Sequence, residues 1–358
     1  MNKKKVYSDL KVFSDGDKLN SLSSEDMTPP IYIRIKPTNI CNHSCWYCGY
    51  QANPEMSMGD TVNKQDSIPF EKMEEICDDF INMKVKAVTF SGGGEPLAYK
   101  KIEVFFDKLV DAGVKIAVIT NGSNLKGKIA KSLANKASWV RVSMDGWDND
   151  SYTKYRKTKG KEFDKIISNM EEFSKIKGTT KLSVAYNVDR DNYTKIYDYT
   201  KLIKEIGADT IKFTGCVVSD NTMENIEYHS SIFEKTTSII KKVKSDFETK
   251  DFEIENVYSV QNTRYDKTYN RCPFSEYLTI IGADLKVYVC HDKAYTESGE
   301  IGSIREQSFY NFWMNGEARN SVRGINPSIS CNHHCTADAK NKLLLEYLSI
   351  DSEHMDFI

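Results

Sequence analysis

Between residues 31 and 219 the chain alternates short runs rich in β-branched residues with longer segments of helical period. This alternation predicts repeated βα units around a parallel sheet. Such a chain closes into a barrel or opens into a doubly wound sheet, and either architecture binds ligands at the C-terminal ends of its strands. Six strands are expected, at 31–37, 86–92, 115–121, 138–144, 181–188 and 210–218. Helices are expected at 69–83, 99–112, 126–135, 162–177, 193–206 and 231–248, and Gly113 and Gly207 stop two of them.

The pattern changes from about residue 250. Residues 251–271 are polar and predict a loop. Residues 277–290 predict a hairpin that turns at Gly282-Ala283-Asp284, and 340–348 predict a helix. No fixed internal repeat or low-complexity tract interrupts the chain.

The charges nearly balance, with 49 Lys and Arg against 51 Asp and Glu and a net charge of -2. No overall field therefore favours a nucleic acid or an anionic membrane, and we expect a small or locally recognised partner. No stretch is apolar for long enough to span a bilayer, and the N-terminal residues lack the apolar run of a signal peptide. These features predict a cytoplasmic protein.

In a reducing compartment the nine cysteines are expected to be thiols, and clustered thiols predict metal ligands or catalytic groups. Cys41, Cys45 and Cys48 follow the first expected strand, at the ligand-binding rim. Thiolates suit iron-sulfur clusters or zinc, and a closed structural site normally has four protein ligands. Three ligands would leave one metal position open for a substrate or cofactor. The alternatives are a zinc site or unrelated buried thiols.

The C-x3-C-x2-C spacing on this loop, with Tyr47 before the last cysteine, resembles the signature of the radical S-adenosylmethionine superfamily. The sequence SGGGEP, residues 91–96, resembles the glycine-rich motif of the same family. The resemblance implies a 4Fe-4S cluster whose open iron binds S-adenosylmethionine. It also implies cleavage of that cofactor to a 5'-deoxyadenosyl radical, which abstracts a hydrogen atom from the substrate.

The resemblance further implies a partial (β/α)6 TIM-like barrel over residues 30–248, after an extension at 1–29. Thr120 and Asp145 are further rim positions, and His43 is expected to support the cluster loop. The expected cofactor-binding residues are Tyr47, Gly92, Gly93, Gly94, Glu95, Pro96, Asn121, Ser143, Arg156 and Asn187.

A second group of four cysteines, enough to ligate every iron of another cubane, lies near the C-terminus. The region resembles the auxiliary-cluster domain called SPASM or its short form Twitch, which implies one auxiliary 4Fe-4S cluster within residues 272–340. A linker at 249–271 would precede this domain and a helix and tail at 341–358 would follow it. A zinc site using His333 or His334 is the alternative. The four cysteines are Cys272, Cys290, Cys331 and Cys335.

Twitch enzymes that oxidise a sugar or aminocyclitol alcohol to a ketone suggest the same oxidoreductase reaction here, with the auxiliary cluster as electron acceptor. Such a reaction needs a general base. It would also need an external electron donor such as flavodoxin or ferredoxin. The candidate bases are Lys212, Asp292, Arg190, Asp189 and His291.

Cys216 lies near the end of the sixth expected strand, where a thiol could return a hydrogen atom to a substrate radical. That role would make the protein an epimerase. Peptide modification by a SPASM-type enzyme is another possibility, although the roughly thirty residues before the first strand are too few for a winged-helix peptide-recognition domain. A binding module with two structural metal sites is the non-enzyme alternative. Cys77 lies in a helical pattern and is expected in the core.

Overall fold

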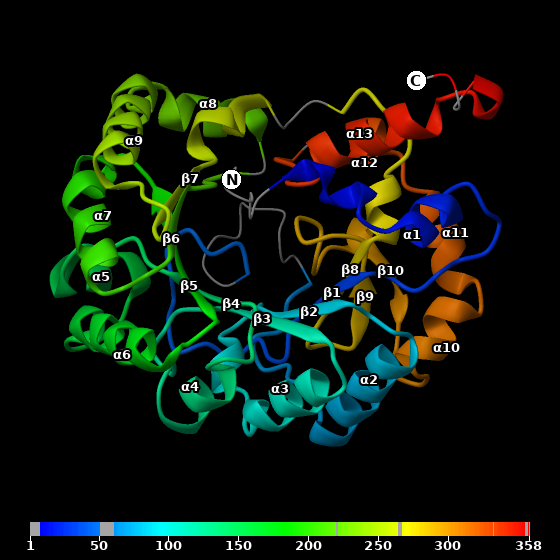
Figure 1. Cartoon of the computed structure of the whole chain (residues 1–358), viewed down its shortest axis with the longest axis horizontal. Coiled ribbons are helices and arrows are strands. Elements are labelled where there is room, and N and C mark those ends of the chain that lie inside the picture. The colour runs from blue at the N-terminus through cyan, green and yellow to red at the C-terminus, as the bar shows by residue number, and fades with distance from the viewer. Residues whose placement is uncertain are drawn as a thin grey trace.

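A curved, mostly parallel sheet with helices on its outer side makes up most of the computed structural model, which describes residues 8–50, 61–219, 221–263, 267–331, 333–354 and 357 (Figure 1). In the described residues the sheet has ten strands in the order β10-β9-β8-β1-β2-β3-β4-β5-β6-β7. Strands from β8 through β1 to β7 are parallel, and β9 and β10 are antiparallel. The strands are β1 Tyr32–Ile35, β2 Ala87–Phe90, β3 Lys115–Thr120, β4 Trp139–Ser143, β5 Lys181–Val188, β6 Thr210–Gly215, β7 Glu253–Asn256, β8 Leu278–Ile281, β9 Lys286–Tyr288 and β10 Glu300–Ser303. The result is a partial TIM-like barrel, as expected.

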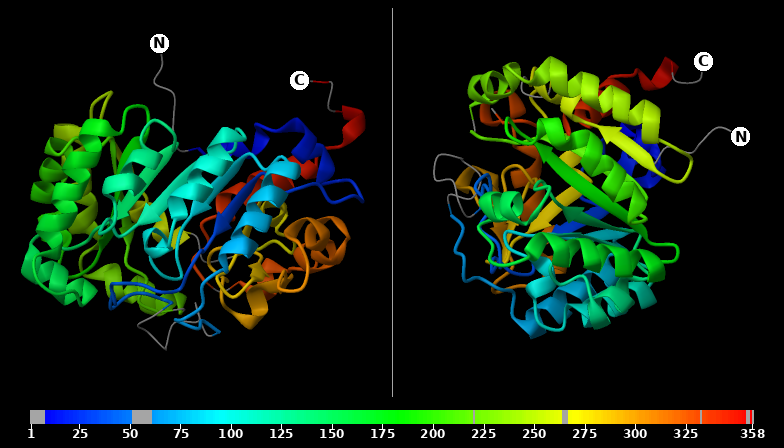
Figure 2. Two further views of the ribbon diagram at one scale, coloured as in Figure 1. Left: turned by 90° about the horizontal axis from the view of Figure 1, so that it is seen from below. Right: turned by 90° about the vertical axis from the view of Figure 1, so that its left-hand side faces the viewer.

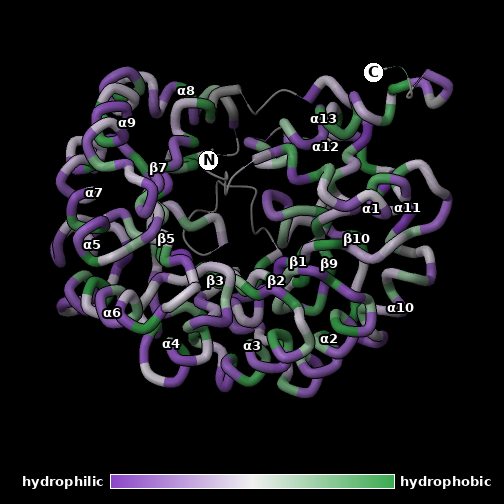
Figure 3. Tube along the Cα trace, in the orientation of Figure 1, coloured by the Kyte–Doolittle hydropathy of each residue, from purple (hydrophilic) through white to green (hydrophobic). Residues whose placement is uncertain are grey.

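Helices cover the outside of this sheet because their apolar faces pack on it, while their polar faces point to water (Figures 2 and 3). Phe90 of β2 and Phe106 of α3, for example, meet edge to face with ring centroids 4.8 Å apart. The six expected helices are present as α2 Phe70–Asn82, α3 Ile102–Asp111, α4 Gly127–Leu133, α6 Glu162–Ile176, α7 Ile196–Glu205 and α9 Phe233–Phe247. The others are α1 Gly16–Ser21, α5 Asn149–Arg156, α8 Thr222–Ser230, α10 Phe309–Met314, α11 Glu317–Arg323, α12 Pro327–Ser330 and α13 Asp338–Leu348. None of the helices in the described part of the chain is both long and apolar enough to cross a membrane.

The structure differs from the sequence prediction around the sixth unit. The segment 251–271, expected to be a loop, contains β7, which pairs in parallel with β6 from Thr210↔Glu253 onward. A strand of four residues gives too short an alternation to be recognised in sequence, and it becomes a strand because β6 offers an unpaired edge. Helices α5 and α8 were also not predicted.

The expected hairpin forms, with Leu285 N–H donating to the Gly282 carbonyl (3.1 Å) in its turn. Its first strand, β8, pairs in parallel with β1, starting at Tyr32↔Leu278. The C-terminal cysteine region is therefore joined to the barrel through the same sheet. Cys272 precedes β8 and Cys290 follows β9, so both cysteines flank this hairpin.

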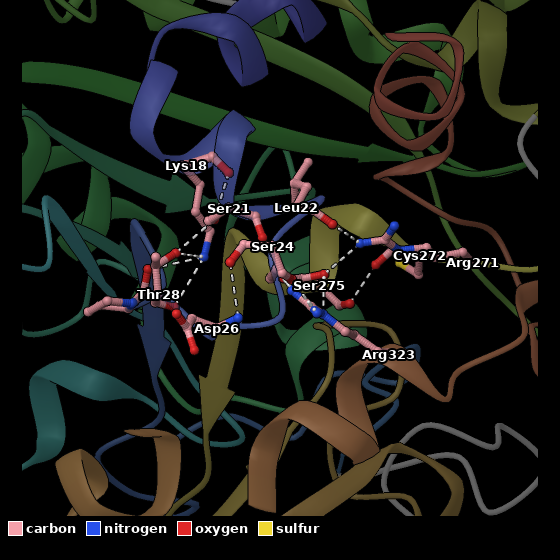
Figure 4. Close-up of polar contacts among 12 residues, drawn as sticks. Lys18, Ser21, Leu22, Ser24, Asp26, Thr28, Arg271, Cys272, Ser275 and Arg323 are labelled. Carbon is pink, nitrogen blue, oxygen red and sulfur yellow. Dashed lines mark hydrogen bonds and ion pairs between the residues drawn. The ribbon is translucent and has the colours of Figure 1, made fainter. Parts of the chain in front are cut away.

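The N-terminal segment is bound to the start of this C-terminal region by a polar network (Figure 4). Arg271 Nη2 donates to the Leu22 carbonyl (2.7 Å), and Arg323 Nη1 donates to the Ser24 carbonyl (2.8 Å). Buried Glu276 accepts from both arginines, at 3.1 Å from Arg271 and 3.0 Å from Arg323. Residues before the barrel thus hold the backbone next to Cys272.

Candidate functional site

A cavity of about 450 Å³ opens at the C-terminal ends of the strands, where the sequence predicted the site. Cys41, Cys45 and Cys48 line it together with the glycine motif. The three cysteines lie on the loop that follows β1. Cysteine thiols from one short loop thus meet the glycine motif of the next βα unit at a common surface.

The glycine motif packs against the start of the cysteine loop. Gly94 N–H donates to the Thr38 carbonyl (3.0 Å), and Glu95 N–H donates to the Ile40 carbonyl (3.0 Å). A Cβ on Gly94 would overlap the Ile40 oxygen and the Asn39 backbone. Glycine is therefore required here for close backbone approach, which fixes the position of the cysteine loop.

Glu95 organises the next part of the rim from a buried position. Its Oε1 accepts from Thr120 Oγ1 (2.6 Å), and its Oε2 accepts from Asn121 N–H (2.7 Å). Asn121 Nδ2 in turn donates to Asn42 Oδ1 (2.8 Å) on the cysteine loop. Burial raises the pKa of Glu95, while these donors oppose that shift. Pro96 begins a short 3-10 helix and is not among the residues that line the cavity.

Arg156, Asp145 and Tyr47 form a buried group beside Cys45. Asp145 is ion-paired with Arg156 and accepts from the Tyr47 hydroxyl (2.5 Å). Burial opposes the charge of Arg156, yet Asp145 and its other neighbours raise its pKa well above the usual range. Arg156 Nε is buried and has no partner in the described structure. An anionic group from a ligand could accept from this donor.

His43 lies inside the cysteine loop and is held by Ser123 and Glu162. Its Nε2 is 3.1 Å from Ser123 Oγ and 3.6 Å from Glu162 Oε1, and Ser123 Oγ donates to Glu162 (2.5 Å). Burial lowers the pKa of His43 to about 4, so the ring is neutral at neutral pH. This contact anchors the cysteine loop to α6, in agreement with the expected supporting role.

The far side of the cavity is lined by small polar groups. Asn187 Oδ1 accepts from Thr214 Oγ1 (2.8 Å), and both residues line the cavity with Ser143. Asn225 and His229, one turn apart on α8, also line it and were missed by sequence reasoning. The sequence did carry a signal for α8, because Asn221 is followed by Glu224 at the third helical position, which is a helix-capping pattern. In the structure the Asn221 side chain caps α8 by accepting from the Met223 and Glu224 N–H groups.

Cys216 is buried and faces the cavity, as the sequence predicted. Its N–H donates to the Val188 carbonyl (2.9 Å), and its own carbonyl lies 2.8 Å from His229 Nε2. Burial raises the pKa of this thiol well above its ordinary value. Cys216 is therefore a neutral thiol at neutral pH. Cys77, in contrast, lies in the core within α2.

A second, smaller cavity of about 50 Å³ is lined by all four cysteines of the C-terminal group. It shares three residues with the first cavity, namely His291, Asp292 and Thr336. The two thiol sets thus lie on either side of one thin wall. Burial raises the pKa of Asp292 in this wall to about 6, against the opposing effect of a backbone hydrogen bond from Thr336.

The smaller cavity also holds a mixed group of possible metal ligands. Among the described residues, Cys290, Asp292 and His333 each offer one ligand atom, and these atoms lie within 4.8 Å of one another. Cysteine, histidine and carboxylate groups are all ligands that zinc accepts. A zinc site that uses His333 therefore stays the alternative to an auxiliary cluster.

Burial keeps thiols of both sets protonated in the metal-free chain. Burial raises the pKa of Cys45 to about 11 and those of Cys41 and Cys335 to about 12. Bare thiols here are neutral at pH 7, and a metal centre would deprotonate them on binding.

Of the five candidate bases, the structure brings two to the cavity, His291 and Asp292. Lys212 lies on β6, where it is ion-paired with Glu255 of β7 (3.7 Å), outside the residues that line the cavity. Asp189 accepts from the Tyr155 hydroxyl (2.7 Å), and Arg190 donates to the Tyr228 carbonyl (2.7 Å). Neighbouring elements bind these three side chains, which are not among the residues that line the cavity.

Part of the chain matches a known protein family. A model of the Radical SAM superfamily matches residues 35–203. GTP 3',8-cyclase of Helicobacter pylori is 30% identical over 175 residues, 48% of this chain and 52% of its own length. GTP 3',8-cyclase of Rhizobium etli is 28% identical over 148 residues, 40% of each chain. A protein named GTPase Obg from Brachyspira hyodysenteriae is 27% identical over 186 residues, 50% of this chain and 27% of its own length. The chain thus spans about half or less of these relatives.

Solved structures share the fold at lower identity. Streptococcus suis SuiB bound to S-adenosylmethionine superposes with a TM-score of 0.64 at 14% identity, covering 89% of this chain and 75% of SuiB. The structure of anSMEcpe with bound AdoMet superposes with a TM-score of 0.58 at 17% identity, covering 89% of this chain and 96% of its own. The fold is therefore shared along nearly the whole chain.

Proposed function

Because residues 35–203 form a domain of the Radical SAM superfamily, we propose that this enzyme abstracts a hydrogen atom from a polar small molecule bound between two cluster sites. The reaction is oxidation of an alcohol, in a sugar or aminocyclitol, to a ketone. The observation that carries the proposal is the pair of thiol-lined cavities that share His291, Asp292 and Thr336. In the proposal, a substrate radical forms at the first cluster and then passes an electron to the second cluster across these shared residues.

The residues at hand fit the cofactors of this superfamily. In the proposal Cys41, Cys45 and Cys48 ligate the first cluster, and the Gly92–Gly94 backbone contacts the cofactor. When bound, the first cluster and S-adenosylmethionine supply a 5'-deoxyadenosyl radical, and the auxiliary cluster supplies an electron acceptor. The auxiliary ligands are Cys272, Cys290, Cys331 and Cys335, within the proposed domain 272–340. Flavodoxin or ferredoxin is the proposed donor of the initiating electron.

The chain's own polar groups orient the cofactor. Arg156 Nε, a buried donor without a partner in the described structure, supports a contact with the cofactor carboxylate. Asn121, Ser143 and Asn187 line the cavity and can bind polar ligand groups. Tyr47 donates to Asp145, the ion-pair partner of Arg156, and so helps to position Arg156. Glu95 accepts from Asn121 N–H and so helps to position Asn121. Pro96 only ends the glycine motif.

Asp292 is the proposed acceptor of the substrate hydroxyl proton because it faces both cavities. In the balanced reaction one hydrogen atom leaves the carbon, one proton goes to Asp292 and one electron leaves toward the auxiliary site. Lys212 of β6, which is ion-paired with Glu255 of β7, has no role in the proposed reaction. The GTP 3',8-cyclase relatives, named for a reaction of GTP, support a small-molecule substrate.

Two alternative functions, epimerisation and peptide modification, are each supported by an observation. Cys216 faces the cavity as a neutral thiol, which suits hydrogen-atom return and epimerisation. The fold neighbours SuiB bound to precursor peptide SuiA and anSMEcpe with bound peptide favour a peptide substrate. The small size of the cavity, about 450 Å³, favours a small molecule.

Anaerobic reconstitution with iron and sulfide, then incubation with S-adenosylmethionine, dithionite and deuterated alcohols, tests the proposal. We expect 5'-deoxyadenosine carrying substrate deuterium together with a ketone product. Cys45→Ala should abolish this product, whereas Cys77→Ala, a core cysteine, should retain it. Label transfer without net oxidation, lost in Cys216→Ala, would establish epimerisation instead. Absence of 5'-deoxyadenosine would overturn the enzyme assignment.

A further inference from the structure

Two cationic residues, Arg34 in β1 and Lys36 directly after it, lie beside the two thiol sites. Side chains alternate along a strand, so Ile33 and Ile35 point to the helices while Arg34 and Lys36 point into the barrel. Lys36 follows β1 directly and keeps its pairing, because its N–H donates to the Ile281 carbonyl (2.8 Å) of β8. Lys36 is buried there, and Arg34 is partly buried.

Arg34 belongs to the auxiliary side. Its side chain lines the smaller cavity with Cys272, Cys290, Cys331 and Cys335. Arg34 Nε donates to the Tyr32 hydroxyl (3.2 Å), a neutral group. Lys267, from the C-terminal part of the chain, lines the same cavity, and its Nζ donates to the His333 carbonyl. Arg34 and Lys267 thus line the four-thiol site together with one carboxylate, Asp292.

Lys36 belongs to the side of the cysteine triplet. It is fully buried, its Nζ donates to the Gly92 carbonyl (3.2 Å), and it lies 3.9 Å from the centroid of the Tyr50 ring. Burial lowers the pKa of Lys36 to about 7, and the nearby Cys48 thiol is among the groups that oppose the shift. Lys36 is thus a basic group beneath the cysteine loop whose positive charge is made costly by burial.

Neither cation has a carboxylate partner of its own. Asp292 attracts both electrostatically, but within the described ranges no carboxylate lies within 4.0 Å of Arg34 or Lys36. Buried charges are normally paired, because an isolated charge in a protein interior is costly. Among the described residues neither cation therefore has an ion-pair partner, and a negatively charged bound group can supply that counter-charge.

We propose that Arg34 and Lys36 are the counter-charges of the two thiolate-bound centres, Arg34 for the auxiliary centre and Lys36 for the radical-generating one. Each cation stabilises the added negative charge when its own centre takes up an electron, and so raises that centre's reduction potential. This inference rests on the proposed function, since it requires both clusters. It adds that one strand tunes two redox centres separately.

Potentiometric titration with electron paramagnetic resonance detection tests the inference on the reconstituted full-length chain. Arg34→Gln should shift the auxiliary midpoint to a more negative potential and leave the first centre unchanged. Lys36→Met should shift the midpoint of the first centre to a more negative potential and leave the auxiliary centre unchanged. Lys115→Met removes the same charge from the exposed first position of β3 and should move neither potential. Two loaded clusters with unmoved potentials in both variants would overturn the inference, whereas failure of the wild type to load iron would instead overturn the proposed function.

A measurement on the metal-free chain covers variants that load poorly. Without a cluster the buried ammonium has no counter-charge, so Lys36→Met should raise the urea midpoint of the apoprotein. The same variant should lower the urea midpoint of the loaded protein. A change of the same sign in both forms would show that Lys36 has only a structural role and would contradict the inference.

Discussion

At the scale of single residues, Gly94 is the position where backbone geometry most directly controls the cysteine loop. A methyl group there overlaps the Ile40 oxygen and the Asn39 backbone, so the loop has to move. We predict that Gly94→Ala lowers iron incorporation at the triplet by about tenfold or more, since metal sites depend strongly on ligand placement. Gly16→Ala, where a Cβ meets nothing within 4 Å, is the matched control and should load normally. Equal iron content in both variants would contradict this.

Asp145 provides a second test at this scale, because it neutralises buried Arg156 and holds Tyr47. Asp145→Ala would leave the guanidinium buried without its charge partner, which typically costs about 3–5 kcal/mol. Urea unfolding of the apoprotein measures this loss. The control is Asp191→Ala, which breaks the exposed ion pair with Lys154 and should leave stability unchanged. Similar losses in the two variants would show that burial of the pair does not matter.

Residue chemistry at the rim was largely predictable from sequence. Resemblance to family motifs pointed to the two thiol sets, the glycine motif and Arg156, and the structure places these groups around the two cavities. The bases were less predictable. Lys212 and Asp292 both looked available, and only the structure shows that β7 supplies Glu255 to hold Lys212 while Asp292 faces both cavities.

At the scale of elements, the docking of α1 depends on Lys18, whose Nζ donates to Thr28 Oγ1 (2.9 Å) and to the Thr28 and Pro29 carbonyls (Figure 4). Burial lowers its pKa from 10.5 to about 8. Between pH 8 and 10 the unfolded chain therefore binds a proton that the folded chain lacks, and stability rises with pH. We predict that the free energy of unfolding of the wild type, relative to Lys18→Met, increases by about 1.4 kcal/mol per pH unit in this window. Urea melts of the reduced apoprotein at several pH values measure the difference, and a flat difference would contradict the shift.

The long helices were predicted well, whereas the short strand β7 was missed. Helices such as α2 and α6 run for three turns or more and show a clear apolar stripe. β7 has four residues, and its strand conformation comes from the β6 edge. Pairing of β8 with β1 joins positions more than 240 residues apart, and nothing local in the sequence encodes such a contact.

At the scale of the whole molecule, one sheet continues from the barrel into the C-terminal hairpin, and the proposed function uses this continuity to let two thiol sets act on one substrate. The N-terminal segment reinforces this arrangement through Arg271 and Arg323. We predict that deletion of residues 8–29 lowers iron content at the auxiliary centre more than at the first centre. Iron and sulfide analysis with the cluster-specific resonance signals checks this, and equal loss at both centres would contradict the selective role of the segment.

The central claim is that the cysteine triplet leaves one iron of its cluster without a protein ligand, so that S-adenosylmethionine can bind there. Electron-nuclear double resonance on the reduced protein, with S-adenosylmethionine isotopically labelled in its amino and carboxylate groups, tests it most directly. A variant with Cys272, Cys290, Cys331 and Cys335 replaced by alanine isolates the first centre. We predict hyperfine coupling to both labelled groups. Coupling to a labelled His43 ring instead, or zinc in place of iron, would contradict the claim.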